Sequence, residues 1–325
     1  MKAIVQRVYG SSAMLAVADV ERPVAGAGQV LVRVRAASVN ARDWHLMRGD
    51  PKIARWMDRS LFRRTGPANP VQGGDFAGTV EAVGEGVTDV AVGEEVFGEA
   101  VSGAFAEYLA VPRDLLDRKP RNLSFAEAAA VPLAANTALT LLRSVDAGQR
   151  VLIIGASGGV GTFAVQIAHA RGAEVTAVCS TRNVEAARSL GAEHVFDYTR
   201  DTVTGRYDTV VDLAGARSLR ELLGLVEPTG TLVLSGGGNY DGGSVFGPIG
   251  LFARGQLARP FVKPTIRVPL AQQSAAALTE LRALIESGDV RPVIDRAYPL
   301  AETAAAIDYM ESHHARAKIV ITVAE

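Results

Sequence analysis

Apolar and polar residues alternate along the first third of the chain, with the period of two that is typical of β-strands with one buried face. Over residues 29–37, Val30, Val32 and Val34 would share one face of a strand, and Arg33 would lie on the other. Similar short patterns, separated by glycine-rich turns, predict further strands at 2–9, 76–83, 95–97 and 105–111. These strands predict a compact, partly open β-barrel.

After Pro120 the pattern changes to apolar strands that alternate with helices. Ser124 and Glu127 have the spacing of a capping box and would open an alanine-rich helix. Residues 151–155 form a fully apolar run of the kind that is buried in a parallel sheet. Further strands are expected at 174–179, 194–198, 208–213 and 231–235, and helices at 160–171, 184–190 and 219–226. Repeated strand–helix units predict a doubly wound parallel sheet, in which the connection between residues 198 and 208 is too short for a full helix.

The last part of the chain has a third pattern. Amphipathic helices are expected at 274–287 and 302–312, followed by a strand at 318–323 that alternates poorly and would therefore be buried. This strand has no partner in the strand–helix series. We therefore expect the tail to return to the first domain.

Composition excludes several classes of protein. The 325 residues include 34 Lys and Arg against 35 Asp and Glu, and this balance argues against general nucleic-acid binding. A single cysteine excludes a disulfide framework and a cysteine-rich zinc site. No apolar run reaches 18 residues, and the first residues become charged too early for a signal peptide, so no transmembrane segment and a cytoplasmic location are expected.

A glycine-rich turn joins the first apolar strand of the second region to its helix. The frame G-x-G-x-x-G is filled by Ala156, Gly158 and Gly161, with alanine in place of the first glycine. Glycine at 158 would let the backbone approach a pyrophosphate, and glycine at 161 would let the helix pack closely on the strand. The alternative is a tight structural turn. In its strand–turn–helix context the motif predicts a dinucleotide site made by Ala156, Ser157, Gly158, Gly159, Val160 and Gly161.

The residues after the second strand of this region distinguish between the two nicotinamide dinucleotides. An NAD site usually has Asp or Glu there, which accepts hydrogen bonds from the ribose 2′-OH. Here Ser180, Thr181 and Arg182 stand instead, and two hydroxyls with a guanidinium suit a 2′-phosphate. NADPH is therefore the expected cofactor, with a solvated residue at a helix start as the alternative for Arg182. Tyr198, which ends the third strand, either adds a hydroxyl to this site or is a half-buried packing residue.

Four segments together resemble one known family. Residues 37–43, 73–80, 103–108 and 151–161 look like the medium-chain dehydrogenase/reductase superfamily, and within it the zinc-independent, quinone-oxidoreductase-like branch. The resemblance implies an α/β fold in which a GroES-like β-barrel catalytic domain is interrupted by a Rossmann domain. It gives a catalytic domain of residues 1–121 and 265–325 and a Rossmann NADPH-binding domain of residues 122–264.

The resemblance also bears on a metal. Zinc enzymes of the superfamily carry ligands at or near the positions of Asn40, Asp75 and Leu133. Zinc takes about four N, S or O ligands, and these three residues do not make a credible set. We therefore expect no zinc.

Further site residues follow from the resemblance. Asn40 would face the nicotinamide and the substrate, where its amide either donates to a developing oxyanion or orients the ring; a structural turn residue is the alternative. Asp43 would brace the loop, and Thr137 matches a position beside the nicotinamide. The residues expected to contact the ribose and nicotinamide from strand ends are Leu213, Ala214, Ser235 and Gly236.

These features predict a zinc-independent, NADPH-dependent reductase that transfers hydride to a small apolar quinone or α,β-unsaturated carbonyl, with a proton supplied by water. Alternatives are an enoyl-thioester reductase or an aldehyde/ketone reductase of the same superfamily. An NADPH-binding redox sensor or structural protein is the alternative outside enzymes. Relatives of this kind often pair Rossmann edge strands, so a homodimer is expected.

Two segments, 48–70 and 246–269, mix arginines with large apolar residues. Three interpretations are open for these segments. They would be exposed helix–loops with solvated arginines, they would form the mouth of a hydrophobic substrate site, or they would contact a membrane surface.

Overall fold

The computed structural model describes residues 1–235, 249–313 and 315–323, which divide between two compact units. The first unit comprises Met1–Asn136, Gln272–Gly288 and Pro292–Glu325, and the second comprises Thr137–Ala271 and Asp289–Arg291. The chain first passes between the units after Asn136, whereas the sequence placed a domain boundary after residue 121. The domain assignment made from the sequence stays a prediction.

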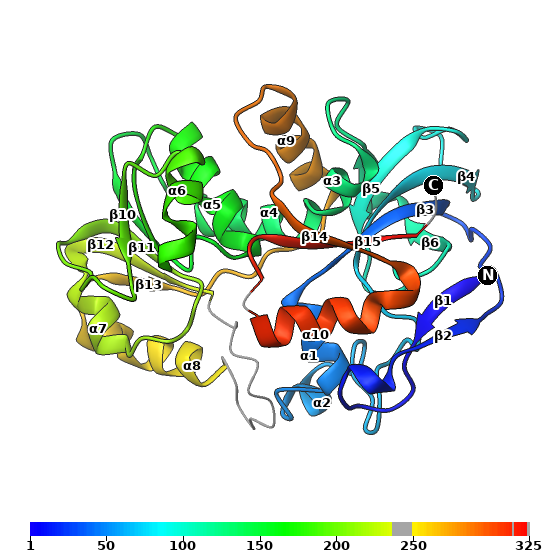
Figure 1. Cartoon of the computed structure of the whole chain (residues 1–325), viewed down its shortest axis with the longest axis horizontal. Coiled ribbons are helices and arrows are strands. Elements are labelled where there is room, and N and C mark those ends of the chain that lie inside the picture. Colours follow the sequence, from blue (N-terminus) through cyan, green and yellow to red (C-terminus); the bar gives the residue numbers. More distant parts are fainter. Residues whose placement is uncertain (236–248, 314, 324–325) are drawn as a thin grey trace. The chain divides into compact units, whose positions relative to one another are not determined.

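The first unit is built on a mainly antiparallel sheet around its longest strand, β3 (Gln29–Val39) (Figure 1). Val30, Val32 and Val34 are fully buried and Arg33 is exposed, as the alternation predicted. The other strands are β1 (Lys2–Val5), β2 (Ala16–Asp19), β4 (Asp75–Val83), β5 (Glu95–Glu99), β6 (Tyr108–Pro112), β7 (Leu116–Arg118), β14 (Ile294–Pro299) and β15 (Lys318–Thr322). The helices are α1 (Ala41–Arg48), α2 (Ala54–Met57), α3 (Phe125–Ala129), α9 (Ala275–Glu286) and α10 (Thr303–His313).

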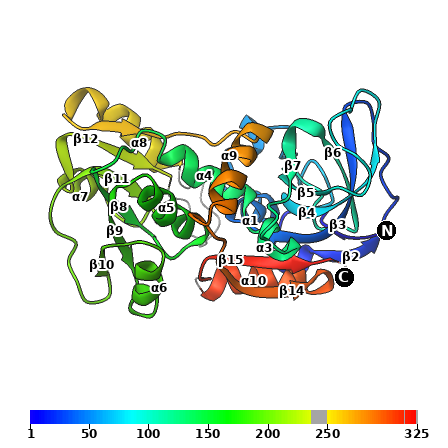
Figure 2. The same cartoon turned by 90° about the horizontal axis from the view of Figure 1, so that it is seen from above.

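The tail of the chain completes this sheet. The strands run in the order β14-β15-β3-β4-β5-β7, and β6 also pairs with β3. β15 lies antiparallel to β3, with Ile319 opposite Val39 and Ile321 opposite Ala37, so the predicted return of the tail is confirmed. The sequence missed β14, a largely exposed strand that runs parallel to β15 beside α10 (Figure 2).

The second unit is a doubly wound parallel sheet. Its elements are β8 (Arg150–Ile154), α5 (Gly159–Ala170), β9 (Glu174–Cys179), α6 (Val184–Ser189), β10 (His194–Asp197), β11 (Tyr207–Asp212), α7 (Leu219–Gly224), β12 (Val226–Leu234), α8 (Ile249–Ala258) and β13 (Thr265–Arg267). The strands lie in the order β10-β9-β8-β11-β12-β13, all parallel. Helices α5 and α6 cover one face and α7 and α8 the other (Figure 2). A further helix, α4 (Pro132–Leu141), begins in the first unit and continues into the second.

The predicted topology of this unit is largely confirmed. The connection between β10 and β11 contains no helix, as its length required. One boundary was wrong: Val226 begins β12 opposite Tyr207 rather than ending α7. Val226 is fully buried, and burial in the sheet wins over the local helical pattern. The fold class predicted from the sequence is therefore confirmed.

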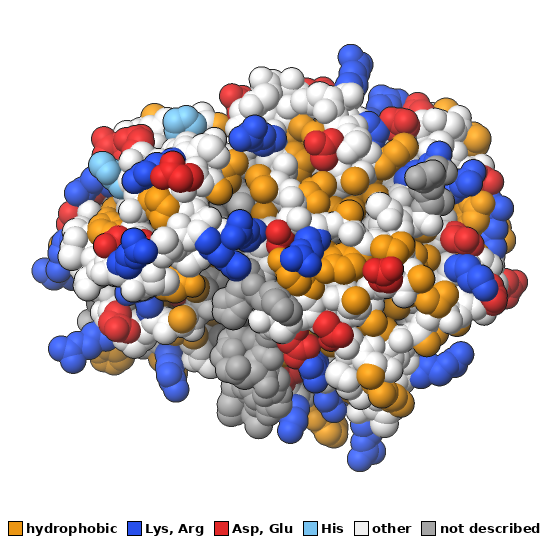
Figure 3. All heavy atoms as spheres, in the orientation of Figure 1, with side chains coloured by type: hydrophobic (Ala, Val, Ile, Leu, Met, Phe, Trp, Pro, Cys, Tyr) orange, Lys and Arg blue, Asp and Glu red, His pale blue; other side chains and the backbone are white. Residues whose placement is uncertain are grey.

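Charges are mixed on the molecular surface. Figure 3 shows basic and acidic side chains interspersed over the visible face, which agrees with a net charge of −1. Within the described residues, no helix is both long and apolar enough to span a membrane. Cys179 is 1% exposed, and burial raises the pKa of its thiol to about 11, so it is an inert core residue.

Candidate active site and cofactor site

The glycine-rich turn of the second unit is shaped by contacts within the unit. Gly155 has a φ of +88°, a conformation that side chains disfavour. At Gly161, a Cβ atom would lie 2.2 Å from the carbonyl oxygen of Gly155, so glycine is required for α5 to approach the turn. The amide of Ala156 donates to the carbonyl of Val178 at 3.1 Å and ties the turn to β9. The packing role predicted for Gly161 agrees with these contacts.

Gly158 differs from Gly161 in this respect. Gly158 is the N-cap of α5, and a Cβ atom there would meet only the carbonyl oxygen of Gly155, at an ordinary 3.5 Å. Nothing within the described structure therefore excludes a side chain at this position. The bare backbone at the helix N-terminus, where the first N–H groups lack intrahelical partners, leaves space for a phosphate.

The loop after β9 carries the residues predicted to hold a 2′-phosphate. Thr181 and Arg182 are exposed and Ser180 is half-buried, where its hydroxyl accepts a hydrogen bond from the Asn183 amide at 3.1 Å. Tyr198 is 55% exposed, which favours an accessible hydroxyl over the packing alternative.

Sequence reasoning missed a carboxylate beside this loop. The Thr181 hydroxyl donates to Asp197 Oδ2 at 2.5 Å, and this hydrogen bond lowers the pKa of Asp197. Arg200 Nε lies 3.7 Å from the same oxygen. Asp197 ends the third strand, and only the strand order places it next to the end of the second. The loop therefore carries one ionised acid among two arginines.

Leu213, Ala214 and Ser235 also lie at this edge of the sheet. The amide of Leu213 donates to Ile154 at 3.0 Å, and that of Ser235 donates to the Asp212 carbonyl at 3.0 Å. The fully buried Asp212 carboxylate holds the turn after β11 by accepting from the amides of Ala214 and Gly215, each at 3.1 Å. Gly236 lies outside the described residues. The structure therefore places Leu213, Ala214 and Ser235 at the carboxyl edge of the sheet, where open parallel sheets bind ligands.

Thr137 and Asn40 belong to other parts of the chain. Thr137 is half-buried in α4, at the beginning of the second unit. Asn40, in the first unit, is the N-cap of α1, and its backbone N–H donates to Asp43 Oδ2 at 2.8 Å. That bond gives Asp43 the bracing role predicted for it.

The side chain of Asn40 is part of a buried polar cluster in the first unit. Its Nδ2 donates to Asp75 Oδ2 at 2.9 Å and, over a longer 3.4 Å, to the carbonyl of Ser38. Its Oδ1 accepts a short hydrogen bond from Lys318 Nζ. Asn40 is 6% exposed, Asp75 is fully buried and Lys318 is 2% exposed. The amide is therefore held by charged groups on both sides.

A second ion pair lies beside this cluster. Arg42 donates to Glu99 Oε1 at 2.8 Å, and Gln273 donates to the same oxygen at 2.9 Å. A Cβ atom on Gly74 would lie 1.9 Å from the Arg42 guanidinium, so this glycine makes room for the arginine. Burial, reinforced by the charge of Asp75, raises the pKa of Glu99 to about 7. Burial also raises the pKa of Asp43 to about 6.

The sequence offered one overlooked signal for this cluster. Lys318 opens the strand that was predicted to be buried, and a buried ammonium needs an opposite charge. Burial lowers the pKa of this lysine, and the carboxylate of Asp75, 3.6 Å away, opposes that effect. The partner could not be identified from the sequence because it lies on a different strand, β4.

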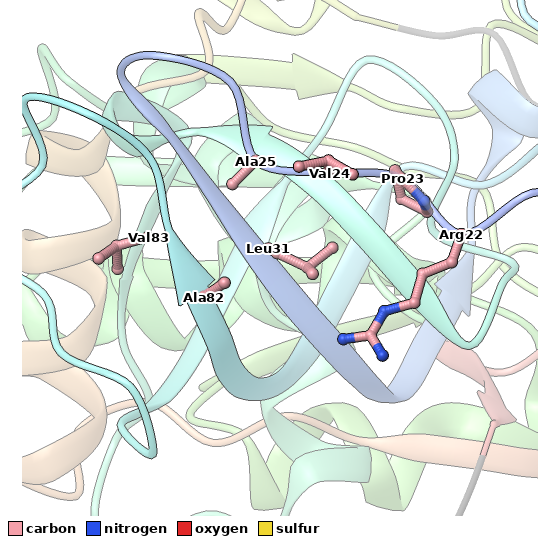
Figure 4. Close-up of a pocket in the computed structure, with 7 residues that line it drawn as sticks. All are labelled: Arg22, Pro23, Val24, Ala25, Leu31, Ala82 and Val83. Carbon is pink, nitrogen blue, oxygen red and sulfur yellow. The ribbon is translucent and has the colours of Figure 1, made fainter.

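A groove of about 380 Å³ on the first unit is a poorer candidate. It is lined mostly by apolar residues of β3, β4 and the segment 22–25 (Figure 4). Its charged residue, Arg22, pairs with Glu81 at 2.9 Å and covers the Tyr108 ring. The groove therefore lacks groups for acid–base chemistry.

Comparison with known proteins now identifies the family. The model for the alcohol dehydrogenase GroES-like domain matches residues 26–121, and that for a zinc-binding dehydrogenase matches residues 190–321. The chloroplastic NADPH-dependent alkenal/one oxidoreductase of Arabidopsis thaliana is 33% identical over 341 residues, covering 99% of this chain and 79% of the relative. The chain belongs to the medium-chain dehydrogenase/reductase superfamily.

Other members of the superfamily are similarly close. The mitochondrial NAD(P)H oxidoreductase RTN4IP1 of Mus musculus is 33% identical over 325 residues, covering 91% of this chain and 82% of the relative. The quinone oxidoreductase structure from Coxiella burnetii is 28% identical, with a TM-score of 0.82 and 99% of both chains covered. The family predicted from the four sequence segments is confirmed, and with it a nicotinamide cofactor.

Although one matched family model is named for zinc, the buried cluster does not fit that ion. Among the residues that the structure describes, no three His, Cys, Asp or Glu side chains are grouped to hold a metal. The Asp75 carboxylate already faces the Lys318 ammonium at 3.6 Å, and this cation would repel a zinc ion. This superfamily member therefore has no suitable donor set in the described part of the cluster.

The two glycines of the turn give a matched pair of variants. We expect Gly161→Ala to lower the free energy of unfolding by about 1–3 kcal/mol, because its Cβ would overlap the turn. Gly158→Ala should unfold like the wild type but bind NADPH at least tenfold more weakly. Thermal unfolding and fluorescence titration measure the two effects. Equal NADPH affinity in Gly158→Ala and wild type would contradict the phosphate site.

Glu99 predicts a pH dependence of stability. With its pKa near 7, folded Glu99 keeps its proton at pH values where the unfolded chain, with a pKa near 4.5, has released it. The folded state then binds more protons, so the free energy of unfolding falls as pH rises from 4.5 to 7. Glu99→Gln removes this pH dependence. Between pH 4.5 and 7, the free energy of unfolding of the variant should therefore rise relative to that of the wild type, by at most about 3 kcal/mol. Urea unfolding at pH 5, 6, 7 and 8 measures this difference. If the free energy of unfolding depended on pH in the same way in both proteins, the prediction would be wrong.

Proposed function

We propose that this protein is an NADPH-dependent reductase that transfers hydride to a quinone or an α,β-unsaturated carbonyl without zinc. The observation that carries the proposal is the turn at residues 156–161, where a helix N-terminus and an uncovered glycine backbone face a carboxyl edge of a parallel sheet. The named activities of the alkenal/one and quinone oxidoreductases support the same substrate classes. Bound NADPH supplies the hydride.

The residues of the second unit would bind and orient this cofactor. The amides at the start of α5 suit the pyrophosphate, because they carry partial positive charge. Arg182, Ser180 and Thr181 suit the 2′-phosphate, and Tyr198 adds an accessible hydroxyl. The Thr181 hydroxyl already donates a hydrogen bond to Asp197, so Arg182 would carry most of the charge recognition.

Asn40 would act on the reacting groups. Because Nδ2 has one firm partner, Asp75, and one long contact at 3.4 Å, it keeps an N–H that a substrate oxygen or the nicotinamide amide can accept. Such a donor stabilises developing negative charge on oxygen, which a zinc ion does in other enzymes. Water would supply the proton. Thr137 would lie beside the nicotinamide.

The proposal also covers the oligomeric state and the cellular location of the protein. A homodimer is proposed through an edge strand of the parallel sheet, since β10 and β13 each pair on one side only among the described residues. A cytoplasmic location is proposed with it.

Arg182 provides a test of cofactor choice. Oxidation of NADPH and NADH at 340 nm, with quinones, enones and aldehydes as acceptors, is expected to favour NADPH at least tenfold in kcat/KM. Arg182→Ala should lower kcat/KM for NADPH about ten- to hundredfold, the loss of one charge-assisted contact, and leave NADH unchanged.

The control for this test is Arg188→Ala. Arg188 is an exposed arginine on α6 that pairs with Glu185 at 2.7 Å. It should change neither cofactor's kcat/KM. An equal loss with both cofactors in Arg182→Ala would argue against 2′-phosphate recognition. Tight NADPH binding without turnover on any acceptor would favour a sensor or structural role.

A further inference from the structure

Lys318 is the buried cation of the first unit. Its Nζ donates to the carbonyl of Val39 at 3.3 Å and to Asn40 Oδ1, and it lies 3.6 Å from Asp75 Oδ2. Two of these groups accept hydrogen bonds from the ammonium, and the Asp75 carboxylate lies at ion-pair distance. The lysine is therefore engaged by groups of the first unit and acts through them.

These contacts permit one orientation of the Asn40 amide. Oδ1 must face the ammonium, which can only donate, and Nδ2 must face Asp75 Oδ2, which accepts its hydrogen bond. Turned by 180°, the amide would bring donor against donor and acceptor against acceptor. The two charges thus fix which side of Asn40 presents N–H.

Stability alone does not account for this lysine. The rest of β15 is an apolar strand, and its residues Ile319, Val320 and Ile321 are buried. Packed apolar residues are commonly as stabilising as a buried ion pair, because charges lose hydration when they are buried. A function for the charge is the simpler explanation.

We propose that Lys318 is a positioning residue for hydride transfer, which fixes the Asn40 amide so that its weakly bonded N–H is kept for the reacting oxygen or the nicotinamide. This inference rests on the proposed function, in which Asn40 faces these groups. Lys318 itself contacts neither substrate nor cofactor in this proposal.

The test removes both charges together. Lys318→Met alone would leave the buried Asp75 without its cation and is expected to fold poorly, so it is combined with Asp75→Asn. In the double variant the new amide at position 75 can donate to Asn40 Oδ1, and the Asn40 side chain is free to turn over. Asp75→Asn alone, in which Lys318 still holds Oδ1, is the reference that assigns the effect to the lysine.

A second lysine supplies the matched control. The Lys119 side chain is 7% exposed, pairs with Glu95 at 3.2 Å and donates to backbone carbonyls of the same unit. Lys119→Met with Glu95→Gln removes another lysine–carboxylate pair, one with a buried lysine and an exposed carboxylate, away from Asn40. This control should keep the wild-type kcat.

We expect the Lys318→Met/Asp75→Asn variant to have a kcat at least tenfold below that of Asp75→Asn. Its Tm and its Kd for NADPH should stay close to those of the reference, because the residues proposed to hold the pyrophosphate and the 2′-phosphate lie in the other unit. If Lys318 had only a structural role, the double variant would instead have a lower Tm, with no selective loss of kcat at unchanged NADPH affinity. A kcat equal to the reference would overturn the proposal.

A measurement without turnover separates this proposal from the proposed function. The side-chain ¹H–¹⁵N signals of Asn40, identified by their loss in Asn40→Ala, should be protected from exchange in wild type and shifted in the double variant. Unchanged signals would overturn the positioning role. If wild type reduces no acceptor, the proposed function is wrong, and these signals still decide whether Lys318 fixes Asn40.

Discussion

The carboxylate of Asp75, on β4, contacts three other segments that are far apart in the sequence. It accepts hydrogen bonds from the Ser38 hydroxyl, the Asn40 amide and the backbone of Leu133, and it faces the ammonium of Lys318. A fully buried carboxylate is costly unless each lone pair is used, and here every partner comes from a different element. The arrangement of β3, α1, α4 and β15 around β4 is therefore tied to the one group that all of them satisfy.

The two units place their polar and charged groups in different environments. In the second unit, the groups proposed to hold an anionic ligand are backbone amides and a few exposed side chains, which cost little to keep in water. The first unit instead buries the carboxyl groups of Asp43, Asp75 and Glu99 close to Lys318 and the half-buried Arg42. Removing Glu99 or Asp75 alone changes the local charge, whereas the exposed Arg188–Glu185 pair can be altered with little consequence.

The fold was predictable where its signals are local. The turn at 155–161, the capping box at Ser124 and the alternation over β3 each depend on residues within a few positions of one another. The cluster around Asn40 was not, because Lys318 is separated from it by 278 positions. Asp197 was missed for the same reason: its relation to Thr181 depends on β10 lying beside β9. The short β13 and the exposed β14 carry too few apolar residues to be recognised.

The position of β15 has a consequence for biosynthesis. Domains fold as their residues leave the ribosome, and the parallel sheet of the second unit is complete once β13 has emerged. The sheet of the first unit must wait for residues 318–322, although most of it was translated before the second unit began. Until then Asp75 lacks the ammonium of Lys318, so the second unit can be folded in the nascent chain while the polar cluster of the first unit is still incomplete.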